Sequence, residues 1–175
     1  MLDAANYSAV ETLRNGRRIE IRALRPDDRD RLVEAVDHAS QQSLYRRFFG
    51  AKKYFTEKEI RFFVNVDFIN HVALVAVAEE EGHPTIVGGA RYVVTAPGTA
   101  EVAFMVIDRY QGQGIGPVLM RHLSLIAREA GLRELTAEVL PSNKAMLKVF
   151  QKSGLSLSTK REAESTHVTL QLSQV

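Results

Sequence analysis

The chain has 175 residues, 45% of them hydrophobic and 25% charged, which fits one domain whose core covers both faces of a sheet. The 23 basic and 21 acidic residues give a net charge of +2, and no segment has the basic, aromatic-interleaved stripe of a nucleic-acid binder. Cysteine is absent, as are a secretory signal pattern and an apolar run of membrane-spanning length. We therefore predict a single domain over residues 1–175, soluble and cytoplasmic, without nucleic-acid or membrane contacts, a disulfide, or an acyl-cysteine intermediate.

The first half of the chain alternates between strand and helix patterns. Asn15-Gly16 between two alternating runs is a strong hairpin signal, and the capping box Thr56-x-x-Glu59 opens a helix. Residues 1–8 show no periodicity and are expected to be frayed. The elements predicted before residue 96 are strands at 10–14 and 17–23, a helix from about 24 to 40, an aromatic helix or turn at 43–49, a helix at 56–66, and strands at 72–78 and 86–95 on either side of a polar turn at 79–84.

The most informative stretch is residues 101–131. Its first part, 101–108, is apolar on both alternating faces, as in a strand that is covered on both sides of a sheet. The turn Arg-Tyr-Gln-Gly-Gln-Gly-Ile-Gly follows at 109–116, and apolar residues then recur at helical spacing, with Pro117 in the first turn. The sequence therefore predicts a strand, a glycine-rich turn and a helix.

The turn at 109–116 has the features of an anion cradle. Its three glycines let the backbone approach a ligand, and the free N–H groups at a helix start suit a phosphate. The spacing excludes the dinucleotide fingerprint G-x-G-x-x-G and the P-loop. A tight turn without a ligand is the alternative. After the helix, the sequence predicts a strand at 135–140, a helix at 142–153 ended by Gly154, and a closing hairpin of 155–159 with 166–172.

Two motifs carry a family resemblance. Gln111-x-x-Gly114-x-Gly116, after an apolar strand, resembles the acyl-CoA pyrophosphate loop of the GCN5-related N-acetyltransferase (GNAT) family. The helix that opens at Asn143 and ends in Lys-Ser-Gly-Leu at 152–155 is similar to the second family signature, with Leu for the usual Phe. The resemblance extends over about residues 10–172 and is closest to the bacterial protein-lysine acetyltransferase branch, through segments at 21–28, 43–49 and 101–104.

The resemblance implies an α+β GNAT fold. Its mixed, mostly antiparallel sheet has helices on both faces and is splayed between the fourth strand, here 101–108, and the fifth, here 135–140. In that fold the arm of acetyl-CoA bonds to the exposed backbone of the fourth strand, and the pyrophosphate sits on the turn. For Asn143, capping of its own helix is the alternative role. The residues that the resemblance assigns to acetyl-CoA binding are Phe104, Met105, Val106, Gln111, Gly112, Gln113, Gly114, Ile115, Gly116 and Asn143.

Glu101 is the predicted general base. A lysine side chain, with a pKa of about 10.4, needs roughly 4.6 kcal/mol to lose its proton at pH 7, so a base is useful. Glu101 starts the strand, about 16 Å from Val106, at the end where the thioester is expected, and desolvation at this strand end would raise its pKa. An ordinary exposed glutamate is the alternative, and His71 is the second candidate base. Phe150 stands where many family members have a tyrosine that acts as general acid.

The predicted function is acetyl transfer from acetyl-CoA, without a metal, directly to a primary amine. The first choice of acceptor is a lysine on a protein such as an acyl-CoA synthetase. A small-molecule amine is the alternative, and so is a non-catalytic acetyl-CoA-binding module, which Phe150 favours. The basic cluster Arg46, Arg47, Lys52 and Lys53 fits an acidic acceptor, the CoA 3′-phosphate or a solvated face. The sequence leaves the acceptor, the acyl-chain preference and the oligomeric state open.

Overall fold

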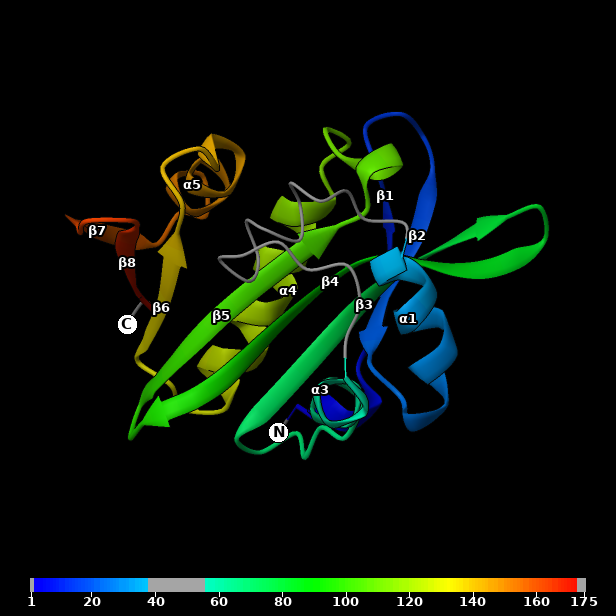
Figure 1. The fold of residues 1–175 in the computed structure, drawn as a ribbon, viewed down its shortest axis with the longest axis horizontal. Coiled ribbons are helices and arrows are strands. Elements are labelled where there is room, and N and C mark those ends of the chain that lie inside the picture. Colours follow the sequence, from blue (N-terminus) through cyan, green and yellow to red (C-terminus); the bar gives the residue numbers. More distant parts are fainter. Residues whose placement is uncertain (1, 38–55, 173–175) are drawn as a thin grey trace.

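In the computed structural model, which describes residues 2–37 and 56–172, one eight-stranded sheet has the order β1-β2-β3-β4-β5-β6-β8-β7 (Figure 1). Neighbouring strands are antiparallel except β5 and β6, which are parallel. The strands are β1 (Ser8–Thr12), β2 (Arg18–Ala23), β3 (His71–Glu80), β4 (His83–Ala96), β5 (Thr99–Val106), β6 (Glu134–Val139), β7 (Ser156–Arg161) and β8 (Thr166–Gln171). The predicted mixed, mostly antiparallel sheet is confirmed.

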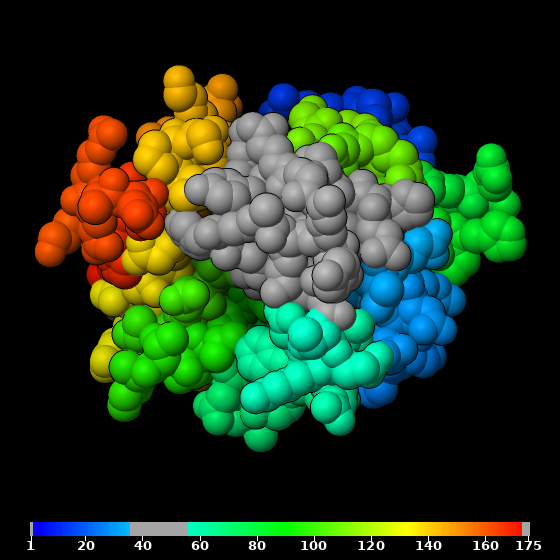
Figure 2. Space-filling view, viewed as in Figure 1, coloured from blue at the N-terminus to red at the C-terminus, as the bar shows by residue number. Residues whose placement is uncertain are grey.

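Helices cover both faces of this sheet, as predicted. They are α1 (Arg29–Asp37), α3 (Glu57–Val64), α4 (Ile115–Glu129) and α5 (Lys144–Gln151). In Figure 1, α1 and α3 lie in front of the sheet, on what we call the α3 face, and α4 lies behind it, on the α4 face. Figure 2 shows the β7–β8 hairpin at one end of the molecule and the tip of the β3–β4 hairpin at the other. Within the described residues, no helix has the length and apolarity needed to cross a membrane.

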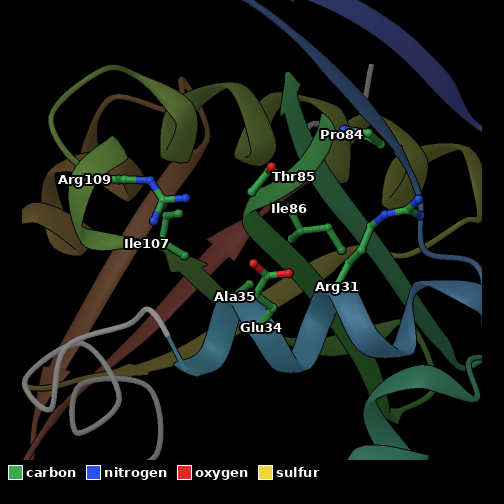
Figure 3. A pocket seen from close by; sticks show the side chains of 8 residues that line it. All are labelled: Arg31, Glu34, Ala35, Pro84, Thr85, Ile86, Ile107 and Arg109. Carbon is green, nitrogen blue, oxygen red and sulfur yellow. The ribbon is translucent and has the colours of Figure 1, made fainter. Parts of the chain in front are cut away.

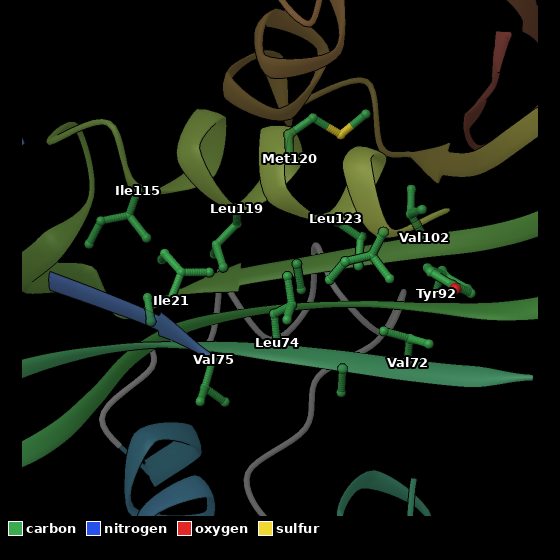
Figure 4. Close-up of a cluster of buried hydrophobic side chains, with 14 of the residues drawn as sticks. Ile21, Val72, Leu74, Val75, Tyr92, Val102, Ile115, Leu119, Met120 and Leu123 are labelled. Atoms are coloured by element: carbon green, nitrogen blue, oxygen red, sulfur yellow. The ribbon is translucent and has the colours of Figure 1, made fainter. Parts of the chain in front are cut away.

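The periodicity of α4 explains how it packs. Leu119, Leu123 and Ile126 recur at helical spacing, are buried, and form one core with sheet residues such as Tyr92 and Val102. Figure 4 shows Leu119 and Leu123 directed at the sheet from one side, while α1 lies on the other side. Because both faces are covered, β3 is buried over eight consecutive residues, and its apolar run does not alternate.

Two predictions differ from the structure. The polar turn expected at 79–84 is a two-residue turn at Glu81 and Gly82, and the flanking residues continue the ladder, with Glu80 opposite His83. Both turn residues have positive φ, 51° and 80°, which matches the twist of a tight hairpin. Residues 2–8 are not frayed, because Ala4–Asn6 form a 3-10 turn and the Tyr7 carbonyl accepts a hydrogen bond from the Ala23 N–H.

Part of the predicted first helix and all of the predicted aromatic element at 43–49 lie outside the described residues, as does the basic cluster at 46–53. The described start of that helix is a 3-10 turn, η2 (Pro26–Asp28), which leads into α1 at Arg29. The predicted capping box of the next helix is confirmed: the Thr56 hydroxyl accepts from the Glu59 N–H at 3.2 Å.

A buried ion pair fixes the start of α1 against β2. Arg22 donates two hydrogen bonds to Asp28, at 2.7 and 2.8 Å, and the Arg25 N–H donates a third at 2.7 Å. The Asp28 side chain is 0% exposed. Burial by itself would raise the pKa of Asp28, but these hydrogen bonds outweigh burial and lower it. The carboxylate therefore remains charged inside the protein.

Asp28→Asn should lower the free energy of unfolding by about 3–5 kcal/mol, because the Arg22 guanidinium would stay buried without its carboxylate. Urea unfolding followed by circular dichroism measures this change. The matched control is Asp30→Asn, whose parent side chain is 98% exposed and which should shift stability by less than about 0.5 kcal/mol. Similar effects for the two variants would contradict a stabilising role for the buried pair.

Candidate active site

The sheet opens between β5 and β6. β5 pairs with β4 along its whole length, but it pairs with β6 at only three positions, Thr99, Ala100 and Glu101. Beyond Glu101 the two strands diverge, as Figure 1 shows. The backbone of Val102–Val106 has no strand partner on that side among the described residues. This confirms the predicted splay, and it leaves an edge that an extended ligand can join by main-chain hydrogen bonds.

The predicted contacts Phe104, Met105 and Val106 lie on this open edge. The Val106 carbonyl already accepts a hydrogen bond from Gln111 Nε2, at 3.0 Å. The open edge therefore leads directly into the glycine-rich turn.

The turn has the backbone geometry of an anion cradle. Gly112 and Gly114 have φ values of 77° and 95°, which non-glycine residues rarely adopt, and a Cβ at either would meet nothing within 4 Å. Gly114 is the N-cap of α4 and makes no side-chain cap, so the N–H groups of Ile115 and Gly116 at the helix start suit an anion. Gly116 also allows close packing, because its Cβ would lie 3.4 Å from Val149 of α5.

The two glutamines of the turn hold the turn itself. Gln113 Nε2 donates to the Arg109 carbonyl at 3.1 Å, and Gln113 Oε1 accepts from Asn15 Nδ2 at 3.0 Å. Gln111 bonds to Val106, as described above. The side chains of Gln111 and Gln113 thus brace the turn, and its backbone N–H groups are the part suited to a ligand.

A cluster centred on Glu80 anchors the residues just before the turn, and no motif in the sequence indicates it. Arg109 donates two hydrogen bonds to Glu80, at 2.6 and 3.0 Å, and Tyr110 Oη donates a third at 2.7 Å. Arg17 of the first hairpin donates to Tyr110 Oη at 2.8 Å. The hydrogen bonds from Arg109 and Tyr110 lower the pKa of Glu80 to about 2. The anchor is thus a permanently ionised carboxylate at neutral pH.

A shallow hollow lies beside this anchor (Figure 3). The two arginines that line it form ion pairs with other residues: Arg109 binds Glu80, and Arg31 lies 3.5 Å from Asp28. We assign no ligand to it. The lining residues are Arg31, Glu34, Ala35, Pro84, Thr85, Ile86, Ile107 and Arg109.

Glu101 lies where the two strands part. It is the last residue of β5 that pairs with β6, opposite Thr136, and its side chain is exposed. The expected desolvation of this carboxylate is therefore not found. Register places Glu101, Val93 and His71 in one row across three strands, on the same face of the sheet. Their outer Cα atoms are about 10 Å apart at the usual strand spacing.

His71, the second candidate base, is in a different environment. It is buried, packs against Phe62 with 4.8 Å between ring centroids, and has a ring nitrogen 2.9 Å from the Arg91 guanidinium. The backbone N–H of His71 donates to Asp67 Oδ1 at 2.9 Å. The contact with Phe62 of α3 also shows that the row of Glu101 and His71 is on the α3 face.

Asn143 and Phe150 lie on α5. Asn143 is the N-cap of this helix, and its Oδ1 accepts from the Met146 N–H at 3.2 Å, so the capping role is realised. Phe150 is buried and packs edge-on against Phe104, with ring centroids 5.9 Å apart. This contact places a ring without a hydroxyl group directly beside the open edge of β5.

A split sheet whose open edge leads to a turn suited to an anion is the arrangement that the resemblance to the GNAT family implied, and sequence comparison agrees. The model of the Acetyltransferase (GNAT) family matches residues 38–155. The chain therefore belongs to the GNAT acetyltransferase family and is an acetyltransferase.

Individual relatives narrow the placement within that family. Acetyltransferase PA5475 of Pseudomonas aeruginosa is 35% identical over 138 residues, 78% of this chain and 74% of that protein. Acetyltransferase Pat of Mycolicibacterium smegmatis is 34% identical over 144 residues, 81% of this chain but only 42% of that longer protein. The crystal structure of the GNAT domain of S. lividans PAT superimposes with a TM-score of 0.85 at 34% identity, covering 94% of this chain and 97% of that one. The similarity to Pat proteins that the sequence indicated is confirmed.

Glu80→Gln should destabilise the protein in a pH-dependent way. The pKa of Glu80 is lowered from 4.5 to about 2, so its stabilising effect is complete above the ordinary value and is lost as the pH falls toward 2. The stability difference between the parent and Glu80→Gln, measured by urea unfolding, should be constant near neutral pH and shrink between about pH 4.5 and pH 2.

Hydrogen exchange on the same variant should show faster exchange of the amides at 108–114, because the turn loses its anchor. The control is Glu79→Gln, whose parent side chain is exposed and which should leave both readouts unchanged. A stability difference that does not vary with pH would contradict the role given to Glu80.

Proposed function

We propose that this acetyltransferase moves an acetyl group from acetyl-CoA directly onto a primary amine, in the first place a lysine on a protein such as an acyl-CoA synthetase, in the cytoplasm. One observation carries the proposal: the gap between β5 and β6 has the anion-binding turn at its open end and Glu101 at its closed end. This arrangement fits a long donor molecule with phosphates at one end and a reactive group at the other.

The residues present fit acetyl-CoA. The donor's amide-containing arm would pair with the free edge of β5 at Phe104 and Met105, as an added strand does. Its pyrophosphate would accept hydrogen bonds from the N–H groups of the 112–116 backbone, where the helix dipole also favours negative charge. Gln111 and Gln113 would act on the donor indirectly, by fixing the turn.

Glu101 would then serve as the base. Glu101 takes a proton from the protonated amine, directly or through a water, and passes it to solvent. The neutral amine then attacks the thioester carbonyl carbon, its second proton leaves by the same route, and the C–S bond breaks to release the CoA thiolate. Because Glu101 is exposed, a bridging water fits its position. Phe150 offers no proton, so the thiolate takes one from water, which its pKa of about 8.5 allows.

The choice of acceptor rests on the kinship with Pat proteins and on the segments at 21–28 and 101–104 that resemble the protein-lysine branch. The two sequence motifs indicate the acetyl-CoA site and do not identify the acceptor, so a small-molecule amine is the second candidate acceptor. The non-catalytic module loses its support, because the chain belongs to an enzyme family.

Glu101→Gln should lower the turnover number by about 10²–10⁴-fold while the dissociation constant of acetyl-CoA stays the same, because a general base contributes about that factor. Thiol release from acetyl-CoA, with a cell lysate and a panel of small amines as acceptors, measures turnover. Calorimetry measures acetyl-CoA binding. Glu129→Gln, an exposed glutamate at the end of α4, is the control that should keep full activity.

Each remaining result has a definite meaning. Turnover with small amines and none with lysate would replace the protein acceptor by a small one. An unchanged rate in Glu101→Gln would remove Glu101 as the base and leave His71. A parent protein that binds acetyl-CoA and acetylates nothing would refute the proposed reaction.

A further inference from the structure

The arm of the sheet beyond the gap carries a polar cluster that no step above uses. It is formed by Glu138 of β6, His167 of β8, and Ser165 and Glu162 of the turn between β7 and β8. We call these four residues the Glu138 cluster.

Strand register places the Glu138 cluster next to Glu101. Glu101 pairs with Thr136, and Glu138 lies two residues further along β6, where side chains return to the same face. The Cα atoms of Glu101 and Glu138 would be about 8 Å apart if the strands stayed paired, and the divergence of β5 and β6 beyond Glu101 makes this distance larger. His167 is the direct cross-strand partner of Glu138, so it is on that face too. The cluster therefore flanks the gap on its β6 side.

The two faces of this arm differ in chemistry, and the difference shows from which side an acceptor can enter. On the α4 face, Leu135, Ala137 and Leu170 are buried in the core with α4. On the α3 face, the alternate positions carry polar residues, among them Thr136 and Glu138. Among the described residues, the polar side from which an amine can approach the closed end of the gap is the α3 face, where Glu101 and the Glu138 cluster lie.

Hydrogen bonds fix the Glu138 carboxylate. Its Oε1 is bonded to His167 Nδ1, and its Oε2 accepts from Ser165 Oγ at 2.7 Å. Burial opposes ionisation, but the hydrogen bonds from His167 and Ser165 outweigh it and lower the pKa of Glu138. Ligand atoms of Glu138, Glu162 and His167 all lie within 4.8 Å of one another, so a second carboxylate is near. The cluster is thus a preorganised anionic site.

We propose that Glu138 is an acceptor-binding residue that holds the protonated primary amine of the acceptor, with Glu162 adding charge, before Glu101 takes its proton. This inference rests on the proposed function and names the acceptor class: a cationic primary amine such as a lysine side chain. Glu138 and Glu101 are on the same face of the sheet, so an amine held at Glu138 lies on the side from which Glu101 is reached. Ser165 and His167 are positioning residues for Glu138.

The test compares Glu138→Gln with Glu134→Gln. Glu134 is on the same strand and face, also two residues from Thr136, but on the closed side where β5 and β6 stay paired. With Nα-acetyl-lysine amide as acceptor, Glu138→Gln should raise KM by about tenfold or more, the cost of losing a charge-assisted hydrogen bond. Its kcat and its acetyl-CoA dissociation constant should stay within about threefold of the parent values, and Glu134→Gln should match the parent.

Two further readouts separate binding from a structural effect. Glu138→Asp keeps the charge and should recover part of the KM loss, and Ser165→Ala keeps Glu138 but loosens it and should raise KM several-fold. The parent KM should rise with added NaCl, and Glu138→Gln should lose most of that dependence. These variants keep the proposal testable if Glu138→Gln folds poorly.

Several results would overturn the inference. They are an unchanged KM in Glu138→Gln, an equal rise in Glu134→Gln, and turnover that a chelator abolishes and Zn²⁺ restores, since the cluster would then be a metal site. A parent protein that acetylates no amine while binding acetyl-CoA is a different failure, because it refutes the proposed function before any variant is compared.

Discussion

The one-sided pairing of β5 is the constraint on which the rest of the structure depends. The backbone of a central strand normally forms hydrogen bonds on both edges, yet β5 pairs with β6 at three residues only. Beyond them, no described strand pairs with its second edge. The long ladder with β4 and the buried layer formed by α4 hold β5 in place despite this loss. The gap persists because neighbours hold the strand, and a ligand that brings its own amide groups can satisfy the open edge.

The same constraint explains how the turn after β5 is built. If the backbone is the binding surface, side chains are free to serve as braces, and Gln111 and Gln113 both bond to backbone carbonyls near the turn. Glu80 adds an external anchor through Arg109 and Tyr110. A phosphate site made of N–H groups depends on their convergence, so a rigid turn would favour phosphate binding. The two faces of the gap differ in chemistry: an apolar core lies on the α4 face, and polar groups lie on the α3 face.

Much of the fold was predictable because its signals are local. The strand, glycine turn and helix over 101–131, the Asn15-Gly16 hairpin and the Thr56 cap all follow from neighbouring residues, and the structure has each of them. The tight turn at Glu81 was mispredicted because polar residues can also continue a ladder. Glu80 was missed for another reason: it meets Arg109 across 29 residues, and nothing near it in the chain signals that contact.

The sequence by itself determined the element order and the glycine turn, since periodicity, capping and glycine geometry act over a few residues. It also indicated the family through two short motifs, and the resemblance to that family implied the mixed sheet. Only the tertiary structure decided where β5 and β6 part, that Glu101 is exposed at that point, and that Glu138 and His167 share its face. These features could not be predicted from the sequence because they depend on strand pairing. Register brings together residues that are far apart in the chain and fixes which side chains share a face.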